Sequence, residues 1–235
     1  MNWLKAMFGA SQRDALSVEH RARLEAWRAL PAPDLGVPHR QTRYVVVDIE
    51  ASGLDQKKDR LISIGAVAVT GGSIGMFDAF EVVLRQAEVS DNANILIHGI
   101  GALAQREGVD PAEALLQFLE YVGKAPLVAY HAFFDQGMID QANRRYLGCE
   151  PKFIWHDLAW VLPELFCERI SGIAGLDNWL EQFKIGNFRR HNAVSDCLAT
   201  AQLLQIAMSR ASAVGLDSSR ELSMVEKARR GLRRS

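Results

Sequence analysis

The chain has few cysteines, no long hydrophobic run and almost no net charge. Its 235 residues include Cys149, Cys167 and Cys197, an odd number without the close spacing of metal ligands. They fit reduced packing residues in a cytosolic protein better than disulfides or a zinc site. No apolar stretch approaches the length that spans a bilayer, and residues 1–8 form too short an apolar region for a secretory signal. We therefore expect a cytoplasmic protein without a membrane span.

The formal net charge of −1 lacks the positive excess that is common in nucleic-acid-binding proteins. Nucleic acid is not excluded, because an enzyme that grips a few terminal nucleotides needs only a local patch, and bound metal adds positive potential. Any single arginine pair is more often a solvated charged face than a binding patch. The candidate pairs are Arg144 with Arg145, Arg189 with Arg190, Arg229 with Arg230, and Arg233 with Arg234.

The length suits one well-packed domain with appendages. Residues 1–43 are expected to form an N-terminal helical appendage with a Pro-rich linker at 31–38, because apolar and amphipathic side chains recur there at helical spacing: Leu16, His20, Leu24 and Trp27. A second short apolar face near the N-terminus is expected to pack in the core rather than against a partner or a membrane. It consists of Trp3, Leu4, Met7 and Phe8. We expect the main domain at 44–210 and a basic C-terminal tail at 211–235.

From Tyr44 onward, the pattern is three strands followed by alternating helices and strands. Apolar runs predict strands at 44–47, 61–69, 77–84 and 126–130. Apolar periodicity, with Pro111 at a helix start and Gly148 at a helix end, predicts helices at 111–122, 135–146, 176–183 and 193–208. This order of elements predicts an α/β domain.

Asp48 and Glu50 stand where the first predicted strand ends. Side chains alternate across a strand, so both acids point to one face while Ile49 points to the other. Two like charges that close repel each other, and a divalent cation would neutralise them; oxygen ligands suit magnesium or manganese. The pair alone is weak evidence for a metal site, because acids at strand ends are also common as solvated caps or turn formers.

Two later segments carry further acids. Residues 130–135, Tyr-His-Ala-Phe-Phe-Asp, follow a second apolar run, and residues 191–196, His-Asn-Ala-Val-Ser-Asp, open a late helical pattern. With Asp-Ile-Glu-Ala-Ser-Gly-Leu at 48–54, they resemble the three sequence blocks of the DEDD exonuclease superfamily. The resemblance covers roughly residues 44–210. It is closest to the histidine subclass, which contains the epsilon proofreading subunit, ribonuclease T and oligoribonuclease.

The resemblance implies a ribonuclease-H-like mixed sheet flanked by helices and a 3′-5′ exonuclease that releases nucleoside 5′-monophosphates. It also implies two Mg²⁺ ions, for which Mn²⁺ can substitute. By this resemblance Asp48, Glu50 and Asp196 would be direct metal ligands, with Asp48 bridging both ions. Asp135 would complete the site directly or through water, and His191 would be the general base.

The spacing between His191 and Asp196 bears on that last role. On one continuous helix, five positions would separate the two side chains by about 140° around the axis. If Asn192 is the N-cap, His191 lies on the preceding loop and can turn back toward the site. A lone histidine is usually a surface or core residue, and here only the surrounding block favours catalysis.

Substrate contacts are expected beside the first block. His98, in a segment that resembles a recurring loop of the family, would line the groove for the terminal nucleotide. Leu54 matches the position of an apolar wedge against the terminal base, although core packing is an equal alternative. Ser52 belongs to the same block. Three residues depart from the family pattern and affect substrate positioning: Ala51 stands where Thr is usual, Ser63 where the second strand often carries Glu, and His131 replaces an Asn.

The substrate is expected to be the single-stranded 3′ end of DNA or RNA. DNA is favoured only modestly, because no motif reports contacts to a 2′-hydroxyl. One alternative is an RNA-trimming exoribonuclease. Another is a non-catalytic nucleic-acid-binding module that recruits a protein partner through residues 1–43 or the tail; retention of all four acids and His191 favours an enzyme.

Overall fold

The computed structural model describes residues 16–170, 174–187 and 190–232. Several residues singled out in the sequence lie outside these described ranges, and their predicted roles are not addressed: Trp3, Leu4, Met7, Phe8, Arg189, Arg233 and Arg234.

The described residues form one five-stranded mixed sheet with the order β3-β2-β1-β4-β5. Its strands are β1 (Arg43–Ala51), β2 (Leu61–Thr70), β3 (Ser73–Val83), β4 (Leu127–Ala129) and β5 (Trp155–Asp157). The first three form an antiparallel meander, while β4 and β5 run parallel to β1. The predicted α/β class is confirmed, and the predicted strands are present.

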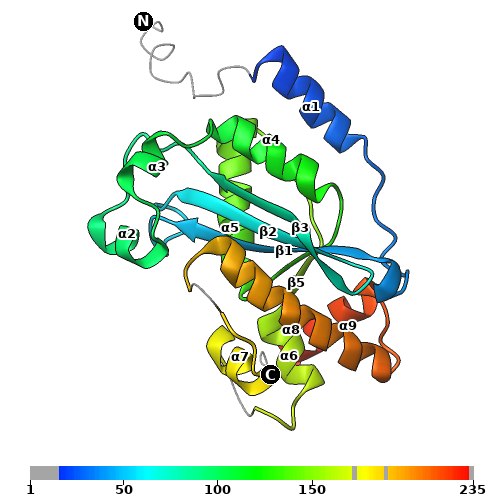
Figure 1. Ribbon diagram of the computed structural model, residues 1–235. Helices are drawn as coiled ribbons and strands as arrows, with labels where there is room; N and C mark the ends of the chain where they lie inside the picture. Colours follow the sequence, from blue (N-terminus) through cyan, green and yellow to red (C-terminus); the bar gives the residue numbers. More distant parts are fainter. Residues whose placement is uncertain (1–15, 171–173, 188–189, 233–235) are drawn as a thin grey trace, which may run out of the picture.

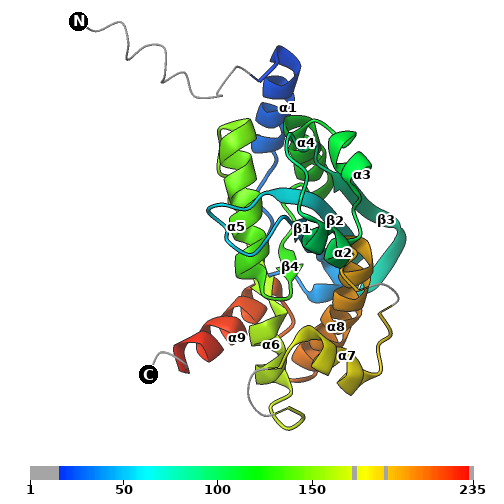
Figure 2. The ribbon, with the colours of Figure 1, turned by 90° about the vertical axis from the view of Figure 1, so that its left-hand side faces the viewer.

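Helices cover both faces of this sheet (Figure 1). One face carries α1 (Val18–Arg28), α4 (Pro111–Val122) and α5 (Ala132–Ala142). The other carries α6 (Leu158–Leu165), α7 (Leu176–Phe183), α8 (Ala193–Ala213) and α9 (Ser219–Leu232). Two short helices, α2 (Asn92–His98) and α3 (Ala102–Arg106), lie at the end of the sheet where β1 finishes, which Figure 2 views from the front. The shorter turns η1 (His39–Gln41) and η2 (Asn143–Leu147) complete the order.

Alternation along β1 divides its side chains between the two layers. Tyr44 and Val46 are buried in the cluster that contains α8. Val45, Val47 and Ile49 are buried in the opposite cluster, with α4 and α5. Asp48 and Glu50 continue the alternation after Val46, so both acids face the layer that contains α8, as the sequence pattern predicts.

The short β4 leaves one edge of β1 open. β1 pairs with β4 only where Val45 and Val46 face Leu127 and Val128. Beyond that point β1 continues beside β2 alone as far as Ala51. The backbone groups on this edge are therefore available to side chains from the loops and helices around it.

The C-terminal segment differs from the expected basic tail. Helix α8 extends to Ala213, and α9 follows it and packs beside α6. Leu222 and Val225 of α9 are buried in the same cluster as α6 and α8, because their spacing of three places them on one helix face. The short elements β5, α2 and α3 were not predicted, because their brief patterns carry little periodic signal. Helices α6 and α9 were not predicted either.

The appendage predicted at the N-terminus is packed onto the main core. Leu24 and Trp27 of α1 are 3% and 6% exposed and belong to the cluster around α4. The Trp27 indole N–H donates to the Gly123 carbonyl at 2.8 Å. Arg23 forms ion pairs with Glu113 and Glu120 of α4. The boundary predicted at residue 43 stays a prediction, but α1 and the core share buried surface.

We expect Trp27→Ala to lower the free energy of unfolding by about 3–5 kcal/mol, because it removes a buried aromatic side chain and leaves a cavity. Val18→Ala, at a 77% exposed position of the same helix, is the control and should change it by less than about 0.5 kcal/mol. Urea denaturation of both variants measures the difference. If Trp27→Ala were as stable as Val18→Ala, α1 would not contribute to the core and would be a separate appendage.

Candidate active site

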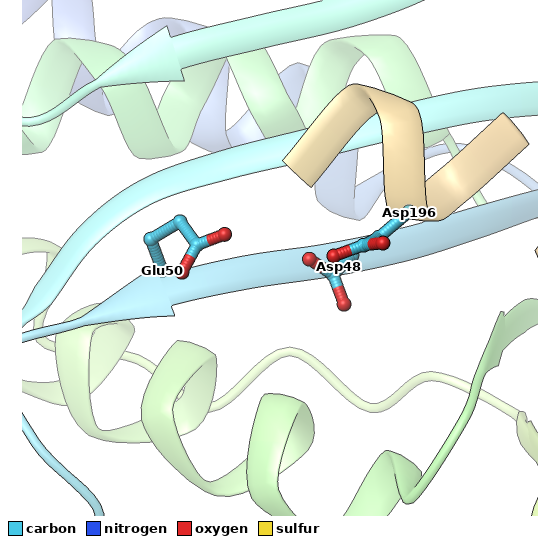
Figure 3. A group of neighbouring side chains, drawn as sticks. All are labelled: Asp48, Glu50 and Asp196. Carbon is cyan, nitrogen blue, oxygen red and sulfur yellow. The ribbon is translucent and has the colours of Figure 1, made fainter. Parts of the chain in front are cut away.

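Three carboxylates meet where β1 ends. Asp48 and Glu50 project from β1 toward α8, and Asp196 lies in the first turn of α8 (Figure 3). One carboxylate oxygen from each residue lies within 4.8 Å of the others. The structure thus brings a late helix to the acid pair that the sequence placed on one face of a strand.

Gly65 allows α8 to come this close. It lies on β2 directly opposite Asp48. A Cβ at this position would lie 2.6 Å from the Cβ of Ala193, in the first turn of α8. That is far inside carbon contact distance, so a larger residue would push the start of α8 away from the sheet and withdraw Asp196. This role was not predicted from the sequence, although a glycine inside a strand often marks such a close approach.

Two carboxyls of this cluster, those of Asp48 and Glu50, have raised pKa values because they share one buried site. Burial, followed by the charges of Asp135 and Asp196, raises the pKa of Asp48 well above its usual range. Burial and the charge of Asp196 raise the pKa of Glu50 to about 8. A divalent cation between these oxygens would relieve the repulsion. The donor set contains only oxygen atoms, which fits magnesium or manganese.

Asp135 reaches the same end of β1 from the opposite layer. It lies in the first turn of α5 and is 5% exposed. Its carboxylate accepts hydrogen bonds from its own backbone N–H and from that of Ile49, on the edge of β1 that β4 leaves open. Among the described residues, the group close enough to share one ion contains Asp48, Glu50 and Asp196 but not Asp135. This favours the water-mediated form of its predicted role.

The turn that starts α5 depends on a left-handed residue, His131, with φ of 64°. Its backbone N–H donates to Oδ1 of Asp157 at 2.9 Å, and Asp157 is 2% exposed at the end of β5. Histidine is among the few non-glycine residues enriched in this region, as asparagine is. The replacement of Asn by His131 thus has a backbone explanation. The sequence analysis missed Asp157, although it too is an acid that follows a short apolar run.

His191 lies on the loop before α8, as predicted. Asn192 is the N-cap, and its side chain accepts the backbone N–H of Ser195 at 3.1 Å. The backbone of His191 has φ of 59°, and its N–H donates to Oδ2 of Asp196 at 3.0 Å. The side chain is exposed. The loop therefore anchors His191 to the acid cluster through its backbone while its imidazole stays accessible.

Two further side chains bind Asp196. Nη1 of Arg190 donates to Oδ1 of Asp196 at 2.7 Å, and the amide N–H of Asn187 donates to the same oxygen. A solvated charged face does not describe Arg190, because the loop folds it against an acid that is 4% exposed. No pattern in the sequence points to Asn187, whose contact depends on the path of the loop.

The predicted contacts from the first block surround the end of β1. Ala51 is the last residue of β1. The carbonyl of Ser52 accepts the side-chain N–H of Asn94 from α2 at 2.6 Å, which fixes the loop that follows. Leu54 on that loop is 89% exposed. The core alternative for Leu54 is therefore wrong, and its role as a wedge stays a prediction.

His98 provides a hydrogen-bond donor without a partner. It ends α2 and is 4% exposed. Its Nδ1 accepts the backbone N–H of Ile100 at 3.0 Å, so the neutral ring carries its proton on Nε2. Burial lowers the pKa of His98, which keeps the ring neutral near pH 7. Within the described residues Nε2 has no hydrogen-bond partner.

Comparison with known proteins places this site in a family. A family model described as Exonuclease (RNase_T) matches residues 45–204, a span that contains all four acids and His191. The chain belongs to this exonuclease family. The DEDD resemblance is thereby confirmed, whereas the histidine subclass stays a prediction. Within the described residues, no helix is long and apolar enough to cross a membrane.

A curated relative and two solved structures are also similar to this chain. The PolC-type DNA polymerase III of Thermotoga maritima is 27% identical over 184 residues, which are 78% of this chain and 13% of the polymerase. The exonuclease thus spans only about an eighth of that relative. Escherichia coli exonuclease I in complex with a dT13 oligonucleotide matches with a TM-score of 0.63 and 18% identity, over 74% of this chain and 42% of that one.

Exonuclease X in complex with 5′-overhanging duplex DNA matches with a TM-score of 0.60 and 20% identity, over 78% of this chain and 99% of that one. At such identities the likeness concerns the fold. It confirms the ribonuclease-H-like α/β architecture that the resemblance implied.

The raised pKa of Glu50 predicts how the metal-free exonuclease responds to pH. Its folded pKa of about 8 exceeds its ordinary value of 4.5. The folded state therefore holds a proton between these values that the unfolded state has released, and stability falls as pH rises from about 4.5 to about 8. We expect Glu50→Gln to be more stable than wild type at pH 9 in EDTA, and to differ little at pH 5.

Urea denaturation at both pH values checks this expectation. Glu25→Gln, on the exposed side of α1, is the control for loss of one carboxylate and should show no such pH-dependent gain. Part of the wild-type dependence should persist in Glu50→Gln, because the pKa of Asp48 is raised in the same direction. A gain in stability of Glu50→Gln confined to pH 5 would contradict the raised pKa of Glu50.

Proposed function

We propose that this exonuclease hydrolyses nucleic acid from the 3′ end with two divalent metal ions and releases nucleoside 5′-monophosphates. The observation that carries the proposal is the convergence of Asp48, Glu50 and Asp196, with Asp135 reaching the same strand end. Burial raises the pKa values of Asp48, Glu50 and Asp135, so gathering these acids beside Asp196 is a costly arrangement without a cation. Retention of the full set favours an enzyme over a non-catalytic recruiting module.

Each residue has a defined task in this proposal. When bound, the two ions would lower the pKa of the attacking water and neutralise charge on the leaving 3′ oxygen. Asp48, Glu50 and Asp196 would hold the ions, with Asp48 contacting both and Asp135 acting through water. His191 would take the proton of the attacking water on its exposed imidazole. Mg²⁺ is the expected ion, and Mn²⁺ should substitute.

The substrate end would be held by the residues around the end of β1. The exposed Leu54 would pack against the terminal base, and His98, at the end of α2, would line the groove for the terminal nucleotide. Ala51, Ser52 and His131 would line the same groove. A protein partner that binds through residues 1–43 stays a prediction; within α1, the face packed on α4 is not available to such a partner.

DNA is the favoured substrate. The relative quoted above is a DNA polymerase, and the two solved structures are exonucleases in complex with DNA. An RNA-trimming exoribonuclease remains the second candidate, because nothing in the site identifies a contact that distinguishes a 2′-hydroxyl.

The test is digestion of 3′-labelled and 5′-labelled single strands, in DNA and RNA of one sequence, with Mg²⁺ or EDTA. We expect mononucleotides to appear at once from the 3′ label and only late from the 5′ label, and no reaction in EDTA. Asp48→Asn should abolish hydrolysis without unfolding the protein, whereas Glu25→Gln should retain it. Release from the 5′ label first would overturn the direction, and metal-independent cleavage would overturn the two-metal mechanism.

His191→Ala should lower turnover by roughly 10²–10⁴-fold, because general-base catalysis contributes about that much. Its affinity for Mn²⁺ should stay near the wild-type value, because this imidazole is not expected to bind an ion. His20→Ala on α1 is the matched control and should keep full turnover. Turnover and calorimetric Mn²⁺ titration on each variant decide the role. A large loss of metal affinity would make His191 a ligand, and unchanged turnover would make it a bystander.

A further inference from the structure

Arg190 forms ion pairs with two acids, of which one belongs to the proposed metal site and the other does not. Its Nη1 donates to Oδ1 of Asp196 at 2.7 Å, and its Nε lies 3.0 Å from Oδ1 of Asp177. Asp196 is 4% exposed and belongs to the acid cluster. Asp177 lies in the first turn of α7, and its side chain is 71% exposed. One guanidinium therefore bridges the centre of the cluster and its solvent-facing rim.

In this arrangement Arg190 acts as a counter-cation for the cluster. Its charge lowers the pKa values of both Asp48 and Glu50 against the effect of burial. A divalent ion held by Asp196 would bring a second positive charge to the same carboxylate, at a separation where like charges repel strongly in a poorly solvated site. Arg190 and the metal therefore compete for Asp196.

We propose that Arg190 exchanges partners when metal binds: it releases Asp196, keeps Asp177 as its anchor, and turns its freed N–H donors to a phosphate of the substrate strand. This inference rests on the proposed exonuclease function and assigns Arg190 as a substrate-positioning residue. The exposed fraction of its side chain, 37%, leaves part of the guanidinium accessible to a strand.

Both the anchor of Arg190 and its expected new partner support the exchange. Asp177 lies outside the group of acids that can share an ion, so metal binding does not remove that partner. A guanidinium presents several donors in a planar fork that matches a phosphate, which a single ammonium cannot reproduce. The adjacent residue, His191, is the proposed base, so the phosphate held by Arg190 would lie close to the attacked bond.

The first test measures metal binding alone. Mn²⁺ is titrated calorimetrically into the full chain without nucleic acid. Removal of the competing cation in Arg190→Gln should tighten Mn²⁺ binding by roughly 5- to 100-fold, the usual range for two coupled sites. Arg144→Gln is the control, because it removes an exposed arginine from an ion pair at the far end of α5 and should bind Mn²⁺ like wild type. If Arg190→Gln bound Mn²⁺ with unchanged or lower affinity, Arg190 would not compete with the metal for Asp196.

The second test separates the charge of Arg190 from its geometry. Arg190→Lys keeps a cation near Asp196, so its Mn²⁺ affinity should stay near wild type. Both Arg190→Lys and Arg190→Gln should raise KM for a short single strand by roughly tenfold or more, because a charged hydrogen bond to phosphate is lost, while kcat at saturation changes less. An unchanged KM in both would overturn the phosphate contact.

The two kinds of failure can be told apart. A wild-type chain that binds no Mn²⁺ and hydrolyses no strand would overturn the proposed function itself. A wild-type chain that binds and hydrolyses, with Arg190→Gln equal to it in both measurements, would overturn only the exchange. Thermal denaturation of each variant in EDTA confirms that the folded state is being compared.

Discussion

Three carboxylates that repel one another are packed side by side at the end of β1, and the residues around them respond to that repulsion. Burial and proximity raise the pKa values of Asp48 and Glu50, so protons neutralise part of the cluster when no cation is bound. Arg190 supplies a further positive charge. An arrangement this unfavourable persists in a fold when it is needed for another purpose, and an oxygen-only cluster of acids is suited to holding divalent ions.

The fold imposes this proximity through backbone packing rather than through the acids themselves. Alternation along β1 presents Asp48 and Glu50 to the α8 layer. Gly65 on the neighbouring strand lets the first turn of α8 approach, and the contact between Gly65 and Ala193 fixes the position of Asp196. Both hydrophobic clusters are built on the same sheet, so the free energy of core burial is available to hold these charges together.

The fourth acid arrives by a different route. Because β4 stops early, the backbone N–H of Ile49 is available to the Asp135 carboxylate. The start of α5 is in turn set by the left-handed residue His131 and its hydrogen bond to Asp157. Asp157 also lies 3.3 Å from Nη2 of Arg230, so α9 is linked to the turn that carries the fourth acid. The C-terminal helix is thus connected to the site through two hydrogen-bonded residues.

Much of the fold could be predicted from local pattern. The central strands, the helices α1, α4, α5, α7 and α8, and the common face of Asp48 and Glu50 follow from periodicities of two and 3.6 residues. Any stretch of chain expresses these periods without knowledge of its neighbours. The cap at Asn192 likewise follows from residue type and position. The short elements β5, α2 and α3 escaped because they contain too few residues to express a period.

Long-range packing determined the rest. The closeness of Asp196 to Asp48 depends on an approach between α8 and β2. Gly65 inside β2 permits a close approach there, but periodicity does not say which element makes it. The attachment of α1 to the core depends on which surface it meets, although its amphipathic spacing shows that it packs on something. Helix α9 and its packing against α6 were not predicted, because the arginine-rich segment was interpreted as a tail. Arg190 and Asn187 gained their roles from the path of a loop. Strand alternation placed Asp48 and Glu50 on one face, and the family resemblance pointed to Asp135 and Asp196. Packing brought Asp48, Glu50 and Asp196 within reach of one ion, because distances between elements are set by the side chains that touch.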